Sequence, residues 1–382
     1  MKWRDQTVFV TGATGFIGGR ICERLVLAKA GPVRALVHSP HKAARIARLP
    51  IEMHQGNLLH QESLRSALGG AKVVIHCGLG NARGILRGTE NLLTAAAEAG
   101  VERFVHMSTA AVHGLTPRPG TETEEAAVRA TGDSYCDNKG RAERVVGRFS
   151  RRGLSTVVLR PSIVYGPYSA WSTRLVQSLQ QNTVPLIDGG RGACNTTYVD
   201  NLVDAVFLSL DTDAASGGTF FITDGEAITW GDFIRAHAAM LGLSEPLPEI
   251  SSEQVLAYYK QQPGLLAGSW KASAQVLRSR QFRELLLQVP LTKRILSGVW
   301  GWMESLTEDR RQKLRSRLGV RRTAQAAPAG PPLPDPVDFA TQTGTVYFRI
   351  DKAREVLGYE PRVLFRQGIA LVEQWMHHAN YL

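Results

Sequence analysis

Tyr135 and Lys139 are the residues whose types and spacing first suggest chemistry in this sequence. They stand four positions apart in "SYCDNKGRAER", residues 134–144, beside a cysteine and an aspartate. In a helix this spacing places both side chains on one face, so that a phenol lies next to an ammonium. The same spacing is also typical of a surface helix whose tyrosine ring packs over a lysine stem. The meaning of the pair therefore depends on the elements that the preceding residues build.

Those preceding elements alternate between two patterns. Compact apolar runs such as "TVFVTG", "VRALVH", "VVIHCG" and "RFVHMST" are separated by helical stretches such as "GTENLLTAAAEAG". This alternation predicts an α/β fold, a doubly wound parallel Rossmann sheet with a smaller C-terminal substrate-binding region. We expect residues 1–160 to form the dinucleotide-binding domain, with later strands from 196–224 added to it. Residues 161–382 then form mainly the substrate-binding region.

The pattern changes after residue 250. Residues 251–325 hold 14 Lys/Arg and 5 Asp/Glu, which is most of the chain's net charge of +11, and they predict a basic helical insert. Within them, 282–322 mix Trp and Leu with Arg and Lys, a composition typical of an interfacial helix. A helical cap over the substrate is the alternative, and nucleic acid is not expected because no recognisable nucleic-acid module is present. The Pro-rich linker 324–338 is predicted to lack regular structure.

The first apolar run leads into a glycine-rich turn, "VFVTGATGFIGGR". Gly12, Gly15 and Gly18 recur there every three residues, between a predicted strand and a predicted helix. A tight turn of this kind needs positive φ, and its backbone must approach a pyrophosphate closely. The helix N-terminus then offers free N–H groups and a partial positive charge to the anion. The turn therefore predicts a dinucleotide site.

The choice between NAD and NADP depends on the end of the second strand. An acidic residue there would hold the ribose 2′-OH of NAD. In "ALVHSPHKAAR" that place is taken by His38, with no Asp or Glu nearby, and Lys42 and Arg45 follow. Because a carboxylate would repel a 2′-phosphate, its absence and the two cations favour NADP over NAD. The alternative is that His38 is a solvated loop residue.

Further motifs extend this pattern along the chain. "TGATGFIG", "GTENLL", "MSTAAVHG", the Tyr135/Lys139 pair, "LRPSIVYGP" and "YVDN" occur in order. They resemble the extended short-chain dehydrogenase/reductase family, the superfamily of NAD-dependent epimerases and dehydratases, over about 5–243 and 345–380. The resemblance implies that Tyr135 acts as general acid or base, that Lys139 lowers its pKa and binds the nicotinamide ribose, and that Thr109 orients the substrate oxygen.

The resemblance also implies which residues contact the cofactor. "GNL" matches the family's Gly-Asp-Leu near the adenine, with Asn57 in place of Asp and still able to accept a hydrogen bond. The expected cofactor-binding residues are Gly12, Thr14, Gly15, Phe16, Ile17, Gly18, His38, Asn57, Leu58, Tyr135, Lys139 and Pro161.

Departures from the family pattern narrow the expected activity. Ala110 and Ala111 replace the acidic pair of sugar-nucleotide dehydratases, and Cys194 replaces an Arg that binds nucleotide diphosphates in sugar epimerases. "LRPSIVYGPYSAW" and "YFRIDKAREVLGYEPRV" are instead similar to 3β-hydroxysteroid dehydrogenases and sterol-carboxylate 3-dehydrogenases. This resemblance implies an NAD(P)-dependent oxidoreductase that interconverts a secondary alcohol and a ketone on a bulky, apolar substrate, steroid-like or long-chain β-hydroxy. The alternatives are a nucleotide-sugar 4-epimerase with tightly bound NAD and a non-catalytic dinucleotide-sensing scaffold.

The remaining polar residues are assigned structural roles. His76 and His106 lie near strand ends without metal spacing, and the four cysteines also show none, so no metal site is expected. His113 stands where the family usually has Tyr and is a candidate to line the pocket. Asp200 and Asn201 are expected to fasten the second region to the sheet.

The location and partners of the protein are also predicted from composition. No run of 18 apolar residues and no signal-peptide core appear, and the thiols fit a reducing compartment, so a cytoplasmic protein is expected. The expected partner is a small-molecule substrate. A peripheral contact with the inner face of a membrane through 282–322, and a homodimer, are left open.

Overall fold

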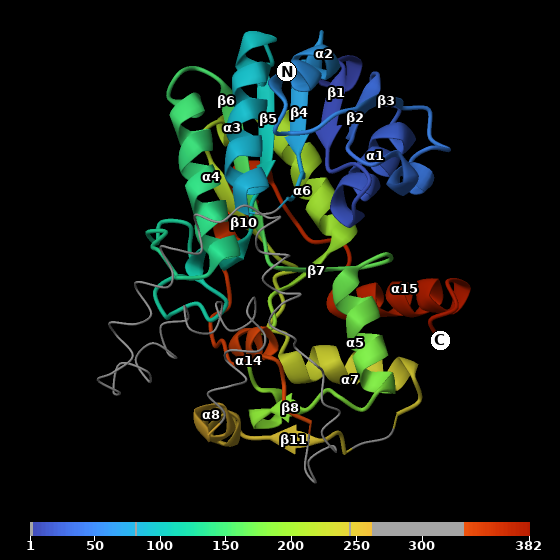
Figure 1. The fold of residues 1–382 in the computed structure, drawn as a ribbon, viewed down its shortest axis with the longest axis vertical. Helices are drawn as coiled ribbons and strands as arrows, with labels where there is room; N and C mark the ends of the chain where they lie inside the picture. The colour runs from blue at the N-terminus through green and yellow to red at the C-terminus, as the bar shows by residue number, and fades with distance from the viewer. Residues whose placement is uncertain (1–2, 81, 244–245, 262–331) are drawn as a thin grey trace, which may run out of the picture.

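A seven-stranded parallel sheet forms the centre of the protein (Figure 1). The computed structural model describes residues 3–80, 82–243, 246–261 and 332–382. All strand pairs in this sheet are parallel, in the order β10-β6-β5-β4-β1-β2-β3. The strands are β1 (Val8–Thr11), β2 (Val33–Val37), β3 (Glu52–Gln55), β4 (Val73–His76), β5 (Arg103–Met107), β6 (Ser155–Pro161) and β10 (Thr219–Ile222).

Helices cover both faces of this sheet, as apolar strands buried on both sides require. Along β1, Phe9 packs into one core while Val8 and Val10 pack into the other, because successive side chains point to opposite faces. Two of the helices pack together on the Val8 side and three on the Phe9 side. These helices are α1 (Phe16–Leu27) and α6 (Val199–Asp211), and α2 (Gln61–Leu68), α3 (Ala82–Glu98) and α4 (Ser134–Ser150). The predicted doubly wound Rossmann fold is confirmed.

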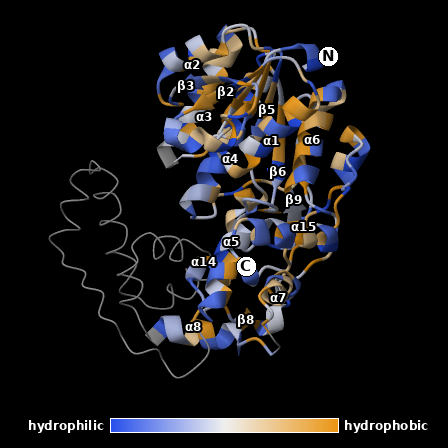
Figure 2. Cartoon of the chain, turned by 90° about the vertical axis from the view of Figure 1, so that its right-hand side faces the viewer, coloured by the Kyte–Doolittle hydropathy of each residue, from blue (hydrophilic) through white to orange (hydrophobic). Residues whose placement is uncertain are grey.

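The strand order reverses next to β1, which is the place where such folds bind a ligand. The chain runs outward from β1 to β2 and β3, then returns to β4 on the other side of β1. Ligands of doubly wound sheets bind at the carboxyl edge near such a reversal, so the loops that follow β1 and β4 lie where a ligand is expected. Figure 2 shows that the strands and α6 are largely hydrophobic, whereas the outer faces of the helices are polar.

A smaller second region lies below the carboxyl edge of the sheet (Figure 1). It contains two short parallel pairs, β7 with β9 and β8 with β11. The elements are β7 (Ile163–Tyr165), α5 (Ala170–Gln180), β8 (Leu186–Ile187), β9 (Thr196–Tyr198), α7 (Trp230–Met240), β11 (Glu249–Ile250), α8 (Ser252–Gln261), α14 (Pro336–Gln342) and α15 (Phe365–His378).

The structure corrects one detail of the predicted linker and covers little of the predicted insert. Helix α14 begins at Pro336, inside the stretch expected to lack regular structure. Asp335 caps it by accepting hydrogen bonds from the backbone N–H groups of Val337 and Asp338, and Pro at the first helical position needs no N–H partner. Of the basic insert, α8 is described. Residues 262–325 lie outside the described residues, and they include 282–322, for which both a membrane contact and a substrate cap were left open.

Candidate active site

The glycine-rich turn between β1 and α1 has the geometry that a pyrophosphate site requires. Gly12 has a φ of +69°, and a Cβ there would lie 2.5 Å from the carbonyl oxygen of Cys77. A Cβ at Gly18 would overlap the carbonyl oxygen of Gly12, so Gly18 lets the helix pack against the turn. Gly15 is exposed and caps α1, which leaves its backbone open to approach. The three glycines thus form a cradle that fits a dinucleotide phosphate.

The other expected cofactor residues lie at this same carboxyl edge. Asn57 and Leu58 follow β3, and the Asn57 Oδ1 atom accepts a hydrogen bond from the backbone N–H of Leu59 at 2.9 Å. A carbonyl oxygen can accept a second bond, so Asn57 keeps a free acceptor position. Pro161 ends β6, beside Ile222 of β10. Thr14, Phe16 and Ile17 lie in the glycine-rich turn and the first turn of α1.

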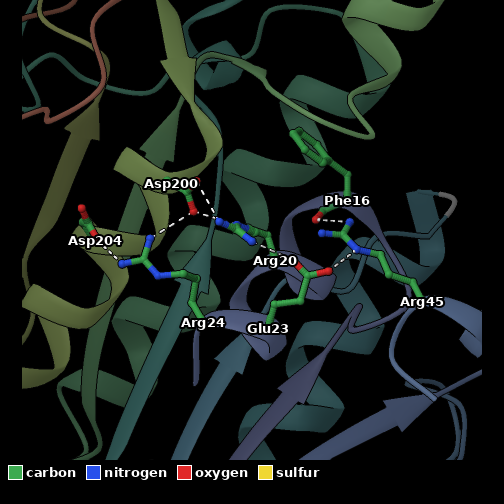
Figure 3. A network of polar contacts seen from close by, with 7 residues as sticks. All are labelled: Phe16, Arg20, Glu23, Arg24, Arg45, Asp200 and Asp204. Carbon is green, nitrogen blue, oxygen red and sulfur yellow. Dashed lines mark hydrogen bonds and ion pairs between the residues drawn. The ribbon is translucent and has the colours of Figure 1, made fainter. Parts of the chain in front are cut away.

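One of the two cations expected near the 2′ position, Arg45, already has an ion-pair partner. The Arg45 guanidinium forms an ion pair with Glu23, with Nε and Oε1 2.8 Å apart, and Nη1 donates to the carbonyl oxygen of Phe16 at 3.3 Å (Figure 3). The side chains of His38 and Lys42 are exposed. Arg45 is therefore less available to bind a 2′-phosphate, whereas Lys42 and His38 remain accessible to one.

Glu23 also pairs with Arg20, and further ion pairs connect α1 to α6 (Figure 3). Arg20 Nε lies 2.7 Å from Asp200 Oδ1, Arg24 Nη1 lies 3.0 Å from the same oxygen, and Arg24 Nη2 lies 2.7 Å from Asp204. Asp200 thus joins two helices on one face of the sheet. Its neighbour Asn201 accepts hydrogen bonds from the backbone N–H groups of residues 362 and 363, which precede α15. Both residues make structural contacts.

Tyr135, Lys139 and Thr109 are brought together between α4 and the end of β5. Asp133 caps α4, and Tyr135 lies in its first turn. Lys139 is buried, and its Nζ donates to the carbonyl oxygen of Met107 at 2.8 Å. Thr109 caps the short 3-10 helix η3 (Ala110–His113), where its Oγ1 accepts a hydrogen bond from the backbone N–H of Ala111, and its side chain is near enough to Tyr135 to lower the pKa of that phenol. The three expected catalytic residues therefore share one site.

The pKa of Tyr135 is raised at this site, whereas the family resemblance implied that Lys139 would lower it. Burial raises the pKa of Tyr135 to about 12, against the lowering effect of Thr109. Burial also lowers the pKa of Lys139 to about 8. The lysine was expected to bring the tyrosine pKa near neutrality, but desolvation of the phenol prevails. Tyr135 is therefore protonated at neutral pH.

A buried polar network beside the site was not foreseen from the sequence. Glu143, one helical turn after Lys139, accepts a hydrogen bond from Ser108 Oγ at 2.5 Å. Arg160 of β6 donates to both oxygens of Glu143, at 3.0 and 2.7 Å, and its Nη1 lies 3.3 Å from His113 Nε2. The spacing of Glu143 four residues after Lys139 could have indicated it. This network fixes α4 against β6 and against the segment after β5 that contains Ser108 and His113.

His76 is a structural residue, as expected. Its Nδ1 lies 2.7 Å from the Thr11 hydroxyl and its Nε2 lies 2.9 Å from the Thr89 hydroxyl. Burial lowers the pKa of His76 to about 3, so the ring is neutral. The ring of His106 lies beside it in a tilted arrangement, with centroids 5.4 Å apart, and burial also lowers the pKa of His106. Within the described residues no His, Cys, Asp or Glu cluster could hold a metal ion.

A cavity of about 480 Å³ lies beside the loop that leads from η3 to α4, and none of Thr109, Tyr135 and Lys139 is among its lining residues. Its wall includes His113, which ends η3, together with Thr131 and Asp133, which lead into α4. The opposite wall includes Ala340 and Thr343 from α14 and the residue after its end. Much of the rest is apolar, contributed by Leu115, Pro117, Pro119, Ala126, Ala127 and Ala130. The volume is typical of a pocket for a small organic molecule.

The parallel sheet, the glycine cradle and the Thr109, Tyr135 and Lys139 set define an NAD(P)-dependent enzyme of the extended short-chain dehydrogenase/reductase type, a class of oxidoreductases and epimerases. Within that class, residues 9–249 match the model of the 3-beta hydroxysteroid dehydrogenase/isomerase family, and the chain belongs to this family. No helix among the described residues is long and apolar enough to cross a bilayer.

The chain is also similar to individual proteins of known activity or structure. The chain is 31% identical over 238 residues to a 4-hydroxy-2-methyl-3-oxo-4-farnesyl-3,4-dihydroquinoline-1-oxide ketoreductase of Stigmatella aurantiaca, which covers 59% of this chain and 70% of that one. It is 27% identical to a 3 beta-hydroxysteroid dehydrogenase/Delta 5-->4-isomerase of Mycobacterium tuberculosis, over 96% of this chain and 88% of that one. A UDP-glucuronic acid 4-epimerase from Bacillus cereus, solved with NAD, has a TM-score of 0.65 at 18% identity, with 98% and 99% of the chains covered. The last likeness shows the fold.

Proposed function

We propose that this protein is an NAD(P)H-dependent reductase of a ketone on a bulky, apolar substrate. The observation that carries the proposal is that Thr109, Tyr135 and Lys139 meet between the end of β5 and the start of α4, and that Asp133, two residues before Tyr135, lies in the wall of a largely apolar cavity. Reduction of a carbonyl needs a proton donor at its oxygen, whereas oxidation of an alcohol needs a base there. A phenol with a pKa of about 12 serves the first need at neutral pH. The relatives named as a ketoreductase and a hydroxysteroid dehydrogenase support this chemistry.

The residues divide the work of the reaction in the following way. The bound dinucleotide supplies the hydride that reaches the carbonyl carbon. Tyr135 donates its hydroxyl proton to the carbonyl oxygen, and Thr109 orients that oxygen by a hydrogen bond. The Lys139 ammonium holds the nicotinamide ribose, as the family resemblance implies, and restores the proton of Tyr135. The apolar wall of the cavity excludes water from the reacting carbonyl.

NADPH is the proposed reductant. His38 and Lys42 are exposed at the end of β2 and in the turn after it, where a 2′-phosphate would lie. Neither is a carboxylate, so nothing at these two positions repels the phosphate. The matched variant is His38→Asp, which places a carboxylate at the end of β2 and should shift preference toward NADH by tenfold or more, about 1.4 kcal/mol.

The test is a direct assay of the purified protein. We expect oxidation of NADPH, and more slowly of NADH, when a long-chain or steroid ketone is added. UDP-glucose, tested without added dinucleotide, separates the epimerase reading, because an epimerase retains its own NAD and interconverts the sugar. Conversion of UDP-glucose together with inertness toward every ketone would contradict the proposal.

A further inference from the structure

We propose that Glu143 is a positioning residue for Lys139: its carboxylate, oriented by the Arg160 guanidinium, keeps the lysine ammonium charged inside the protein. This inference rests on the role of Lys139 in the proposed ketone reduction, and it adds the groups that control the charge of that lysine. The pair of Glu143 with Arg160 then has a function beyond fixing α4 in place.

The first step is that Glu143 lies beside Lys139. The two residues are four positions apart on α4, and both side chains are almost fully buried. Helical positions four apart share one face, with Cβ atoms roughly 6 Å apart. Both side chains also reach consecutive residues at the end of β5. Lys139 Nζ donates to the Met107 carbonyl oxygen at 2.8 Å, and the next residue, Ser108, donates to Glu143 at 2.5 Å.

The second step is that Glu143 carries a negative charge. Its two oxygens accept hydrogen bonds from Arg160 at 3.0 and 2.7 Å, and one of them also accepts from Ser108. This is the pattern of an ionised carboxylate, because a protonated carboxyl group would carry a donor on one oxygen. Lys139 shares α4 with this carboxylate, whereas the guanidinium comes from β6 and also reaches His113. The carboxylate is therefore the nearer of the two charges to Lys139.

The third step concerns the other titratable groups that face Lys139. They are His76 and Cys77 at the end of β4, His106 in β5, and Tyr135 one turn earlier on α4. Burial lowers the pKa of His76 to about 3 and also lowers the pKa of His106, so both rings are neutral. Burial raises the pKa of Cys77 and of Tyr135 to about 12. None of these four groups offers Lys139 a charge at neutral pH.

The fourth step is the balance at Lys139 itself. Burial lowers the pKa of Lys139 to about 8, while Cys77 and Glu143 act in the opposite direction. Because the Cys77 thiol is neutral at that pH, the charge that opposes burial is the Glu143 carboxylate. An opposite charge within ~4–6 Å moves a pKa by roughly one to three pH units. Without this carboxylate, at least about half of the molecules would carry a neutral lysine at pH 7.

Two substitutions with opposite effects on the local charge test the inference. Glu143→Gln leaves the Arg160 charge unopposed and should lower the pKa of Lys139 by about one pH unit or more. Arg160→Met leaves the Glu143 charge unopposed and should raise it. The pKa is measured by NMR on the full chain with isotope-labelled lysine, and the Lys139 signal is identified by its loss in Lys139→Arg. A purely structural role of the pair predicts no such opposite shifts.

A double variant guards against misfolding of the single ones. Glu143→Gln combined with Arg160→Met leaves no buried charge without a partner, so its stability should stay closer to that of the wild type. It should still lower the pKa of Lys139, because the nearer charge is lost, but by less than Glu143→Gln alone. An unchanged pKa in the double variant would overturn the inference, as would shifts in the same direction in the two single variants.

Asp204→Asn is the matched control. It breaks the ion pair of a similarly buried carboxylate with Arg24, on the face of the sheet opposite to α4. Its stability should fall while the pKa of Lys139 stays unchanged. A shift equal to that of Glu143→Gln would contradict the assignment of the effect to Glu143.

The pH dependence of ketone reduction separates this inference from the proposed function. If Lys139 works as proposed, the alkaline fall in kcat/KM with NADPH moves in each variant together with the pKa measured by NMR. Opposite NMR shifts in a protein that reduces no ketone would support the inference and contradict the reductase function. Ketone reduction with a Lys139 pKa that no variant moves would support the reductase function and overturn the inference.

Discussion

At the glycine-rich turn, neighbouring backbone atoms limit which residue each position can hold. At the cavity, the wall is instead built from residues of segments that lie far apart in the chain. Gly12 and Gly18 are confined by the carbonyl oxygens of Cys77 and Gly12. The cavity instead combines the loop after β5 with residues around α14, more than two hundred positions later. A backbone requirement leaves a glycine signature in the sequence. A wall of side chains can be built in many ways and leaves none.

The largest effect should come from breaking the side-chain network. Glu143→Gln leaves the buried Arg160 guanidinium without its counter-charge, and removal of one partner of a buried ion pair costs about 3–5 kcal/mol. The loss is measured as the free energy of unfolding in denaturant. Glu98→Gln is the control, because the exposed pair of Glu98 with Arg65 contributes about 1 kcal/mol or less. Equal losses in the two variants would contradict a structural role for the network.

The backbone requirement of the glycine-rich turn is tested by replacing two glycines of positive φ with alanine. Gly12→Ala adds a Cβ that meets backbone atoms and strains the turn, with an expected cost of about 3 kcal/mol and loss of dinucleotide binding. Gly100→Ala has a similar φ of +68° but open space around it, so about 1 kcal/mol of strain and normal binding are expected. Dinucleotide titration and denaturant unfolding measure both quantities. Normal binding by Gly12→Ala would refute the cradle.

These two regions also explain how much of the protein could be predicted. The sheet, its helices and the glycine turn follow from local patterns, and they were predicted correctly. The ion pair of Arg45 with Glu23 was not predicted, because it requires the 3-10 helix η2 (Pro40–Arg45) to fold back onto α1. The pKa of Tyr135 was predicted in the wrong direction, since spacing places Lys139 beside it but does not report how deeply the phenol is buried.

A smaller effect is expected from pH. The pKa of Lys139 is lowered to about 8, so this side chain is charged below that pH and neutral above it, while Tyr135 remains protonated up to about pH 12. If the ammonium holds the cofactor, kcat/KM for ketone reduction should fall about tenfold per pH unit above pH 8. A profile that stays flat until Tyr135 ionises would show that the charge of Lys139 is not required.

Lys139→Arg sharpens this measurement. A guanidinium remains charged throughout the accessible range, so the fall above pH 8 should disappear in whatever activity the variant retains. Persistence of the same alkaline fall would assign it to another group.

The central claim, that Tyr135 donates the proton while the glycine edge binds the cofactor, is tested most directly by Tyr135→Phe. The variant keeps the ring but loses the hydroxyl, which lies near Thr109. NADPH affinity, measured by calorimetry, should remain within about twofold, while the rate of ketone reduction in a single turnover should fall by about a hundredfold or more. A variant that binds NADPH normally and still reduces the ketone near the wild-type rate would contradict the account.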